Sequence, residues 1–126
     1  MRYLCIICAE KVMETMTPAE AEKHFREYEA LFAKLRKSGH LVSANRLMPA
    51  STAKTVRVRK KRVTIKDGPF AETKEQFGGY FIIEAADTDE AIGIASQIPG
   101  AKIGCVEVRP IADDERTVAA LDGISN

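Results

Sequence analysis

The stretch YFIIEAADTDEAIGIASQIPGAKIGCVEVR, residues 80–109, joins a strand, a helix and a second strand. Its first apolar run is typical of a strand. Asp87 and Glu90 have the spacing of a capping box, which starts a helix, and the pair Pro99-Gly100 ends that helix. A strand at 103–109 completes a βαβ-like unit. The apolar residues expected to line the inner side of the helix are Ala91, Ile92, Ala95 and Ile98.

A similar unit opens the chain. Residues 2–9 are apolar on both alternating faces, which predicts a strand buried on both sides. Thr17-Pro18-Ala19-Glu20 is a capping box with proline at the first helical position, and Gly39 ends the helix that it starts. Residues 40–48 are predicted to form the next strand. The inner side of this first helix is expected to carry Ala21, Phe25, Tyr28, Phe32 and Leu35.

A β-hairpin is inserted between the two units. Residues 55–59 and 62–66 alternate polar and apolar around Lys60-Lys61, although neither turn residue is the glycine or asparagine that tight hairpins favour. The segment also carries five cations within six residues, Arg57, Arg59, Lys60, Lys61 and Arg62. No aromatic side chain stands among them for bases to stack on, so nucleic-acid binding is not expected. An anionic ligand or an acidic protein partner fits these cations better.

The order of elements predicts an α+β fold, a ferredoxin-like sandwich with an inserted β-hairpin. We expect one domain over residues 1–110 and a C-terminal tail over 111–126, with a short helix near 118–121. Two helices cover one face of a four-stranded sheet, yet the first strand is apolar on both faces. The uncovered face therefore predicts a homodimer through the sheet.

Composition places the chain among ordinary globular proteins. It has 126 residues, a formal net charge of +1, 45% hydrophobic and 29% charged residues, which argues against a whole-protein nucleic-acid or membrane binder. Cys5 and Cys8 have a C-x-x-C spacing within a strand, where they point to opposite faces and are expected to be inert buried thiols. With no apolar stretch long enough to span a membrane, a reduced cytoplasmic location is expected.

The stretch DGPFAETKEQFGGYFIIEAADTDEAIGIASQIPG, with the later GCVEVRP, resembles the YCII-related family in its DGPF-domain branch. The resemblance runs from RYLCII to Pro110 and implies a dimeric α+β barrel, in a superfamily that also holds muconolactone isomerases and small monooxygenases. One relative is linked to dehydrochlorination of a chlorinated aromatic breakdown product. Other members accompany or are fused to extracytoplasmic-function sigma factors.

The same resemblance implies a His and Asp pair that lines a cleft. Counted forward from the start of the helix, His24 takes the histidine position, and counted back from the following strand, Tyr28 takes it. The two lie four residues apart on one helical face. Asp67 of the DGPF motif is the candidate acid. From the residues alone, His24 is expected to be a partly exposed surface residue, Tyr28 a core residue and Asp67 the cap of a turn.

With the roles that the resemblance implies, these residues predict a cofactor-independent enzyme of proton transfer, an isomerase or lyase, that acts on a small carbonyl or lactone compound. Asp67 is the expected base, with His24 or Tyr28 as the partner acid. Glu72 and Glu75 are two carboxylates without a third ligand, so no metal is expected. The alternative is a non-enzymatic accessory or ligand-sensing module linked to extracytoplasmic-function sigma factors, in which the basic hairpin contacts a partner.

Overall fold

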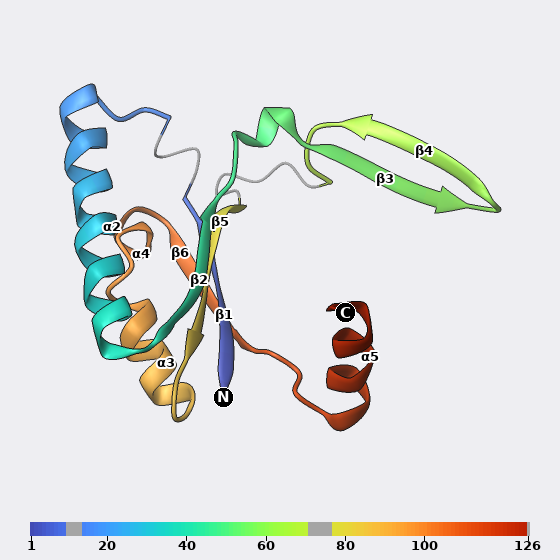
Figure 1. Cartoon of the computed structure of the whole chain (residues 1–126). Coiled ribbons are helices and arrows are strands. Elements are labelled where there is room, and N and C mark those ends of the chain that lie inside the picture. Colours follow the sequence, from blue (N-terminus) through green and yellow to red (C-terminus); the bar gives the residue numbers. More distant parts are fainter. Residues whose placement is uncertain (10–13, 71–76, 126) are drawn as a thin grey trace.

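A computed structural model describes residues 1–9, 14–70 and 77–125 of the chain (Figure 1). Its helical elements are α2 (Pro18–Ser38), the 3-10 helix η1 (Ala50–Thr52), α3 (Thr88–Ala95), α4 (Gly100–Ile103) and α5 (Glu115–Ser125). Its strands are β1 (Arg2–Cys8), β2 (Leu41–Arg46), β3 (Lys54–Arg59), β4 (Arg62–Asp67), β5 (Phe77–Glu84) and β6 (Cys105–Pro110).

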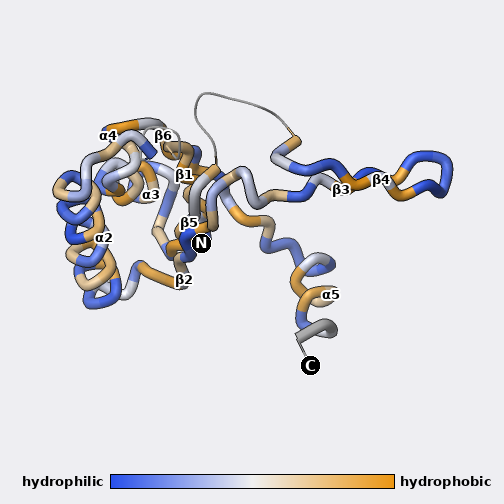
Figure 2. The backbone as a smooth tube through the Cα atoms, turned by 90° about the horizontal axis from the view of Figure 1, so that it is seen from above, coloured by the Kyte–Doolittle hydropathy of each residue, from blue (hydrophilic) through white to orange (hydrophobic). Residues whose placement is uncertain are grey.

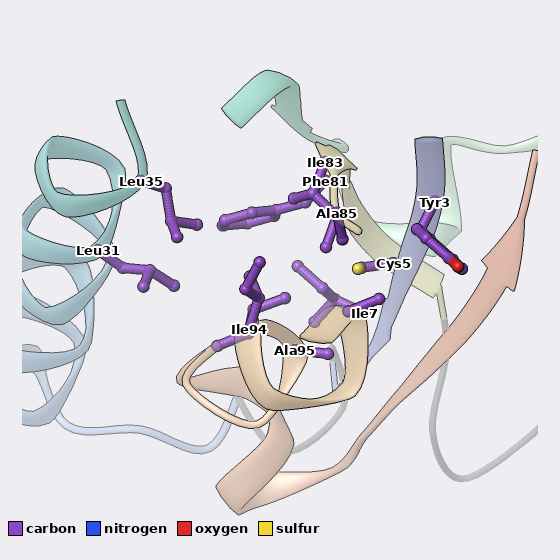
Figure 3. Close-up of a cluster of buried hydrophobic side chains, with 12 residues drawn as sticks. Tyr3, Cys5, Ile7, Leu31, Leu35, Phe81, Ile83, Ala85, Ile94 and Ala95 are labelled. Carbon is purple, nitrogen blue, oxygen red and sulfur yellow. The ribbon is translucent and has the colours of Figure 1, made fainter. Parts of the chain in front are cut away.

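Four strands form an antiparallel sheet in the order β2-β5-β1-β6. This order and the positions of α2 and α3 on one face confirm the ferredoxin-like sandwich (Figure 1). Register places Cys5 of β1 opposite Phe81 of β5 and Val108 of β6. Residues at alternate positions of each strand therefore meet the helices, and a buried cluster fills the space between sheet and helices (Figure 3).

The capping signals in the sequence define the helices correctly. Thr17 accepts a hydrogen bond from the Glu20 amide, Glu20 accepts one from the Thr17 amide, and Gly39 ends α2 in the left-handed conformation at φ 80°. At α3, Asp87 accepts from the Glu90 amide at 2.8 Å. The predicted inner side of this helix was partly wrong, since Ile94 is buried and Ile92 is 52% exposed.

The pair Pro99-Gly100 does more than end a helix. Residues 96–98 already leave the α-helix, and Pro99 is the N-cap of α4, a short helix that was not predicted. A proline suits that place because the first helical amides have no intrahelical acceptor. This turn of chain brings Gly100 against α2, where it matters for the site described below.

The inserted hairpin is present as predicted, and it stands away from the rest of the molecule. β3 and β4 pair with each other in a separate two-stranded sheet within the described part of the chain. Figure 1 shows this hairpin projecting on the side of the four-stranded sheet opposite α2 and α3. The turn residues Lys60 and Lys61 take positive φ angles of 50° and 64°.

The second face of the four-stranded sheet is not covered by α2 or α3. Leu4 and Ile6 of β1 and Ile82 of β5 lie at the positions that alternate with the buried residues, and all three are partly exposed. The tail forms α5, which is longer than predicted and stands off from the sheet in both views (Figures 1 and 2). None of the helices described is long and apolar enough to cross a membrane.

Candidate functional site

A cavity of about 200 Å³ lies between α2 and the sheet. Apolar and aromatic side chains from α2 and from the helix-facing side of β1 and β5 provide most of its lining. The cavity opens to solvent beside its exposed lining residues, such as Phe25 and Arg46. The lining residues are Ile7, Ala9, Met16, Ala21, His24, Phe25, Tyr28, Phe32, Ala44, Asn45, Arg46, Gly78, Gly79, Tyr80 and Phe81.

The volume of the cavity suits a single ring. An apolar protein cavity of about 150 Å³ accommodates benzene, whereas pockets for drug-sized ligands begin at about 300 Å³. Two of the lining aromatic rings form a wall, because Phe32 of α2 and Phe81 of β5 stack with centroids 5.3 Å apart. The cavity therefore matches a small planar or monocyclic molecule better than a peptide or nucleotide.

His24 lies in this cavity wall and is only 8% exposed. The interpretation of His24 as a surface residue was therefore wrong, and Phe25, placed on the inner side, is instead 55% exposed. The Nε2 atom of His24 is buried with no hydrogen-bond partner among the described residues. A buried polar atom without a partner costs free energy, so it is a position where a ligand atom could bind.

The surroundings of His24 favour the neutral form of its ring. Burial lowers the pKa of His24 below its ordinary 6.5 because the charged form loses hydration. Lys102 of α4 lowers it further, and Glu27, which pairs with Lys102 at 3.6 Å, acts in the opposite direction. A neutral imidazole with an unpartnered nitrogen can accept a proton near neutral pH.

Tyr28 lies next to His24, one helical turn further along α2. The two rings meet edge to face with centroids 5.0 Å apart. The Tyr28 hydroxyl accepts a hydrogen bond from the Gly100 amide at 3.2 Å, and burial raises the pKa of the phenol. No acceptor for the hydroxyl proton of Tyr28 is found in the part of the chain that the structure describes. The prediction that Tyr28 packs in the core with its hydroxyl satisfied at the edge is confirmed.

Gly100 permits this arrangement through close approach. A Cβ at that position would lie 2.6 Å from Cγ2 of Ile7 and 3.0 Å from the Tyr28 hydroxyl. The short helix α4 can therefore reach the hydroxyl only with glycine at its start. No local sequence signal predicts this contact, because Tyr28 and Gly100 are 72 residues apart.

Arg46 was not singled out in the sequence, yet it is the cation among the described residues that line the cavity. It stands opposite Gly79 in the β2–β5 register, two residues from Ala44, which stands opposite Phe81. This alternation puts Arg46 on the sheet face that carries the cavity. A guanidinium there offers a partner for an anionic or strongly polar group on a ligand.

Asp67 lies elsewhere. It ends β4 at the base of the hairpin, its carboxylate pairs with Lys54, and its side chain is 84% exposed. It is absent from the described residues that line the cavity, so the structure brings together His24 and Tyr28 but not Asp67. The following Gly68 has φ 93° and donates to the Ala53 carbonyl at 2.8 Å, which closes the hairpin. Glu72 and Glu75 lie outside the described residues.

Comparison with known proteins identifies relatives. A family model described as YCII-related domain matches residues 1–114. An uncharacterised protein of Rhizobium meliloti (strain 1021) is 37% identical over 105 residues, covering 82% of this chain and 85% of the relative. A solved structure, 5-chloro-2-hydroxyhydroquinone dehydrochlorinase from Burkholderia phenoliruptrix AC1100 in complex with 2,5-dihydroxybenzoquinone, is 17% identical, with a TM-score of 0.49 and coverage of 92% of this chain and 98% of that chain.

Proposed function

The chain belongs to the YCII-related family, and from this premise we propose that it is a proton-transfer enzyme, an isomerase or lyase, for a small monocyclic carbonyl or lactone compound. One observation carries the proposal. The buried Nε2 atom of His24 is unpartnered among the described residues and belongs to a side chain that lines a cavity of about 200 Å³. An acceptor nitrogen in a small apolar cavity is suited to remove a proton next to a carbonyl group.

The chemistry assigns a role to each of three side chains. Nε2 of His24 takes a proton from the carbon beside the carbonyl, and the electron pair moves toward the carbonyl oxygen. The Tyr28 hydroxyl donates a hydrogen bond to that oxygen as negative charge develops on it. Return of the proton to another carbon gives an isomer, whereas loss of a leaving group gives an elimination product. Arg46 attracts a polar or anionic substituent at the rim.

The experiment that tests this proposal measures proton removal directly, so the product of the reaction does not have to be known. A monocyclic ketone, a monocyclic lactone and benzene as a probe without a carbonyl are incubated with the protein in D2O. Exchange of the hydrogens beside the carbonyl is then followed by NMR. We expect the wild-type protein to catalyse exchange and His24→Gln to reduce the rate by about 10²- to 10⁴-fold, the usual contribution of a general base.

Two matched variants make the result specific. His40→Gln changes the other histidine, which contacts Ser38 at 2.7 Å and Glu90 at 3.2 Å, and is expected to leave exchange unchanged. Asp67→Asn tests the acid of the DGPF motif. Loss of exchange in Asp67→Asn with full exchange in His24→Gln would transfer the role of base to Asp67 and refute our assignment.

A second candidate function is a ligand-sensing module, and the apolar lining of the cavity favours it. Such a cavity can bind a ring without converting it. A carbonyl probe that raises the melting temperature of the protein but shows no hydrogen exchange would support this candidate. About a hundredfold excess of probe over its dissociation constant should stabilise the folded state by about 2.7 kcal/mol.

We also infer that two copies associate through the uncovered face of the sheet. The partly exposed Leu4, Ile6 and Ile82 occupy that face, and the described helices leave it open (Figure 1). An apolar face of this kind on a sandwich is typically buried by another layer. Sedimentation velocity over a range of protein concentrations tests the association.

A further inference from the structure

The most unusual part of the molecule is the hairpin of residues 54–67, here called the arm. Its register pairs Val56 with Ile65 and Val58 with Val63, so these four side chains share one face. They are exposed by 59%, 67%, 56% and 63% respectively. Figure 2 shows the same pattern, with hydrophobic residues along both strands and a hydrophilic tip. The arm thus presents an apolar surface that its own chain does not bury.

The opposite face of the arm is basic. Alternation places the cations of the two strands, apart from Lys54, on the side away from the valines. Two further cations, Lys60 and Lys61, form the turn. The side chains of the basic face are Arg57, Arg59, Arg62 and Lys66.

An isolated hairpin of this kind is not expected to be stable in water. A two-stranded ribbon is at best marginally stable in water, and three or more strands or a packed layer are normally needed. The turn adds to the cost, because two lysines adopt positive φ angles that favour glycine or asparagine. The arm is therefore expected to gain order from a surface that covers its apolar face.

The distribution of charge identifies that surface. The arm carries seven Lys and Arg and one Asp, a formal charge of +6. The other 112 residues carry 12 Lys and Arg and 17 Asp and Glu, a formal charge of −5. The near-neutral whole thus consists of a basic arm and an acidic body of almost equal and opposite charge. The arm projects away from the four-stranded sheet and from α2 and α3 of its own chain, so we assign the complementary acidic surface to the body of a second copy (Figure 1).

We propose that the arm of each copy docks on the acidic body of a second copy, with its apolar face buried and its cations paired across the interface. The inference rests on the dimer proposed above and names a second contact region within it. The direction of the arm supports this, because it extends on the same side as the uncovered sheet face that the dimer would use (Figure 1). Two copies packed face to face would each place an arm beside the other.

Cross-linking between isotopically distinct chains tests the proposal directly. Equal amounts of unlabelled and 15N-labelled full-length protein are mixed and treated with a zero-length carbodiimide, which joins lysine amines to carboxylates in contact. We expect Lys60, Lys61 or Lys66 to be joined to Asp or Glu residues outside the arm in peptides of mixed isotope composition. The ion pair of Lys54 with Asp67 gives a link within one chain and serves as the internal standard.

Variants of the arm measure its share of the association. Val58→Thr with Val63→Thr keeps β-branched side chains at positions exposed in the single chain, so folding should be unaffected. We expect this pair, and separately Arg57→Gln with Arg59→Gln and Arg62→Gln, to weaken self-association at least tenfold by sedimentation. The matched control Ile92→Gln alters an equally exposed apolar residue on α3 and is expected to leave the dissociation constant unchanged.

The outcomes separate the two proposals. A wild-type protein that stays monomeric at every concentration refutes both the sheet dimer and the docked arm. A dimer that is indifferent to the arm variants, with arm links only within one chain, refutes the arm and leaves the sheet dimer standing. Binding of a DNA duplex that the arginine variants abolish, with unchanged self-association, would assign the arm to nucleic acid and also refute the proposal.

Discussion

His24 has a pH-dependent consequence for stability that follows from its lowered pKa. Below its ordinary pKa of 6.5, the unfolded chain binds a proton at this residue that the folded chain resists. Stability from the neutral ring is therefore complete above about pH 6.5 and is lost as the pH falls below it. Thermal unfolding at pH 7.5 and pH 5 should show a wild-type protein that loses more stability on acidification than His24→Gln. Parallel losses in the two proteins would contradict the pKa shift.

The burial of the cysteines was only partly predictable from the sequence. Cys5 and Cys8 lie on opposite faces of β1, as the alternation of a strand requires, and the burial of Cys5 is confirmed. Cys8, however, is only partly buried, because it faces the uncovered side and stands opposite Cys105 of β6. The pairing of Cys8 with Cys105 depends on tertiary structure, so the local spacing C-x-x-C does not predict it.

Burial raises the pKa of the Cys5 thiol to about 11. Because the thiolate is the reactive form, Cys5 should remain unmodified by iodoacetamide at pH 8 in the folded protein, whereas the exposed Cys105 should react. Peptide mass spectrometry measures both residues in one sample. Unfolding in urea provides the control, since Cys5 should then react. Rapid labelling of Cys5 in the native protein would contradict its position in the core.

At the scale of the elements, the positive φ angles in the turn of the arm predict that the arm can be stabilised by substitution. Replacing Lys60 by Asn and Lys61 by Gly supplies residues that accept positive φ angles. Hydrogen exchange of the arm amides should slow about fivefold, which corresponds to about 1 kcal/mol in the free energy of opening. The matched variant Lys60→Gln with Lys61→Gln removes both charges without easing the backbone. Equal slowing in the two variants would show that charge, and not strain, limits the arm.

The helices and strands were largely predictable, because caps and alternation are local signals. Thr17 and Gly39 fix both ends of α2, and the pattern around Lys60-Lys61 predicts β3 and β4. The inner side of α2 was less predictable. The residues buried there include His24, while Phe25 is exposed at the edge of the cavity, since the position of the helix over the sheet decides which residues are covered. The candidate site depends on that position, which a single sequence does not encode locally.

For the whole molecule, the resemblance to the YCII-related family is confirmed, and the order of elements was sufficient for the sandwich. The site was only partly accessible to sequence reasoning. His24 and Tyr28 were selected through the family resemblance, and the structure brings them together because both lie on α2. Arg46 and Gly100 were missed because their places at the cavity depend on sheet register and on the turn into α4. Asp67 was selected from a motif that closes the hairpin, and it is not among the described residues that line the cavity.

The separation of charge between arm and body also governs how the protein adheres to charged materials. A chain of net charge +1 would ordinarily be held weakly by ion-exchange resins near neutral pH. With +6 on a projecting arm, single copies should instead bind a cation-exchange resin firmly. Docked arms are neutralised, so retention should decrease as the loading concentration rises. The elution volume of this protein would then report its own assembly. It would decrease as the loading concentration rises, whereas the elution volume of most proteins does not depend on concentration.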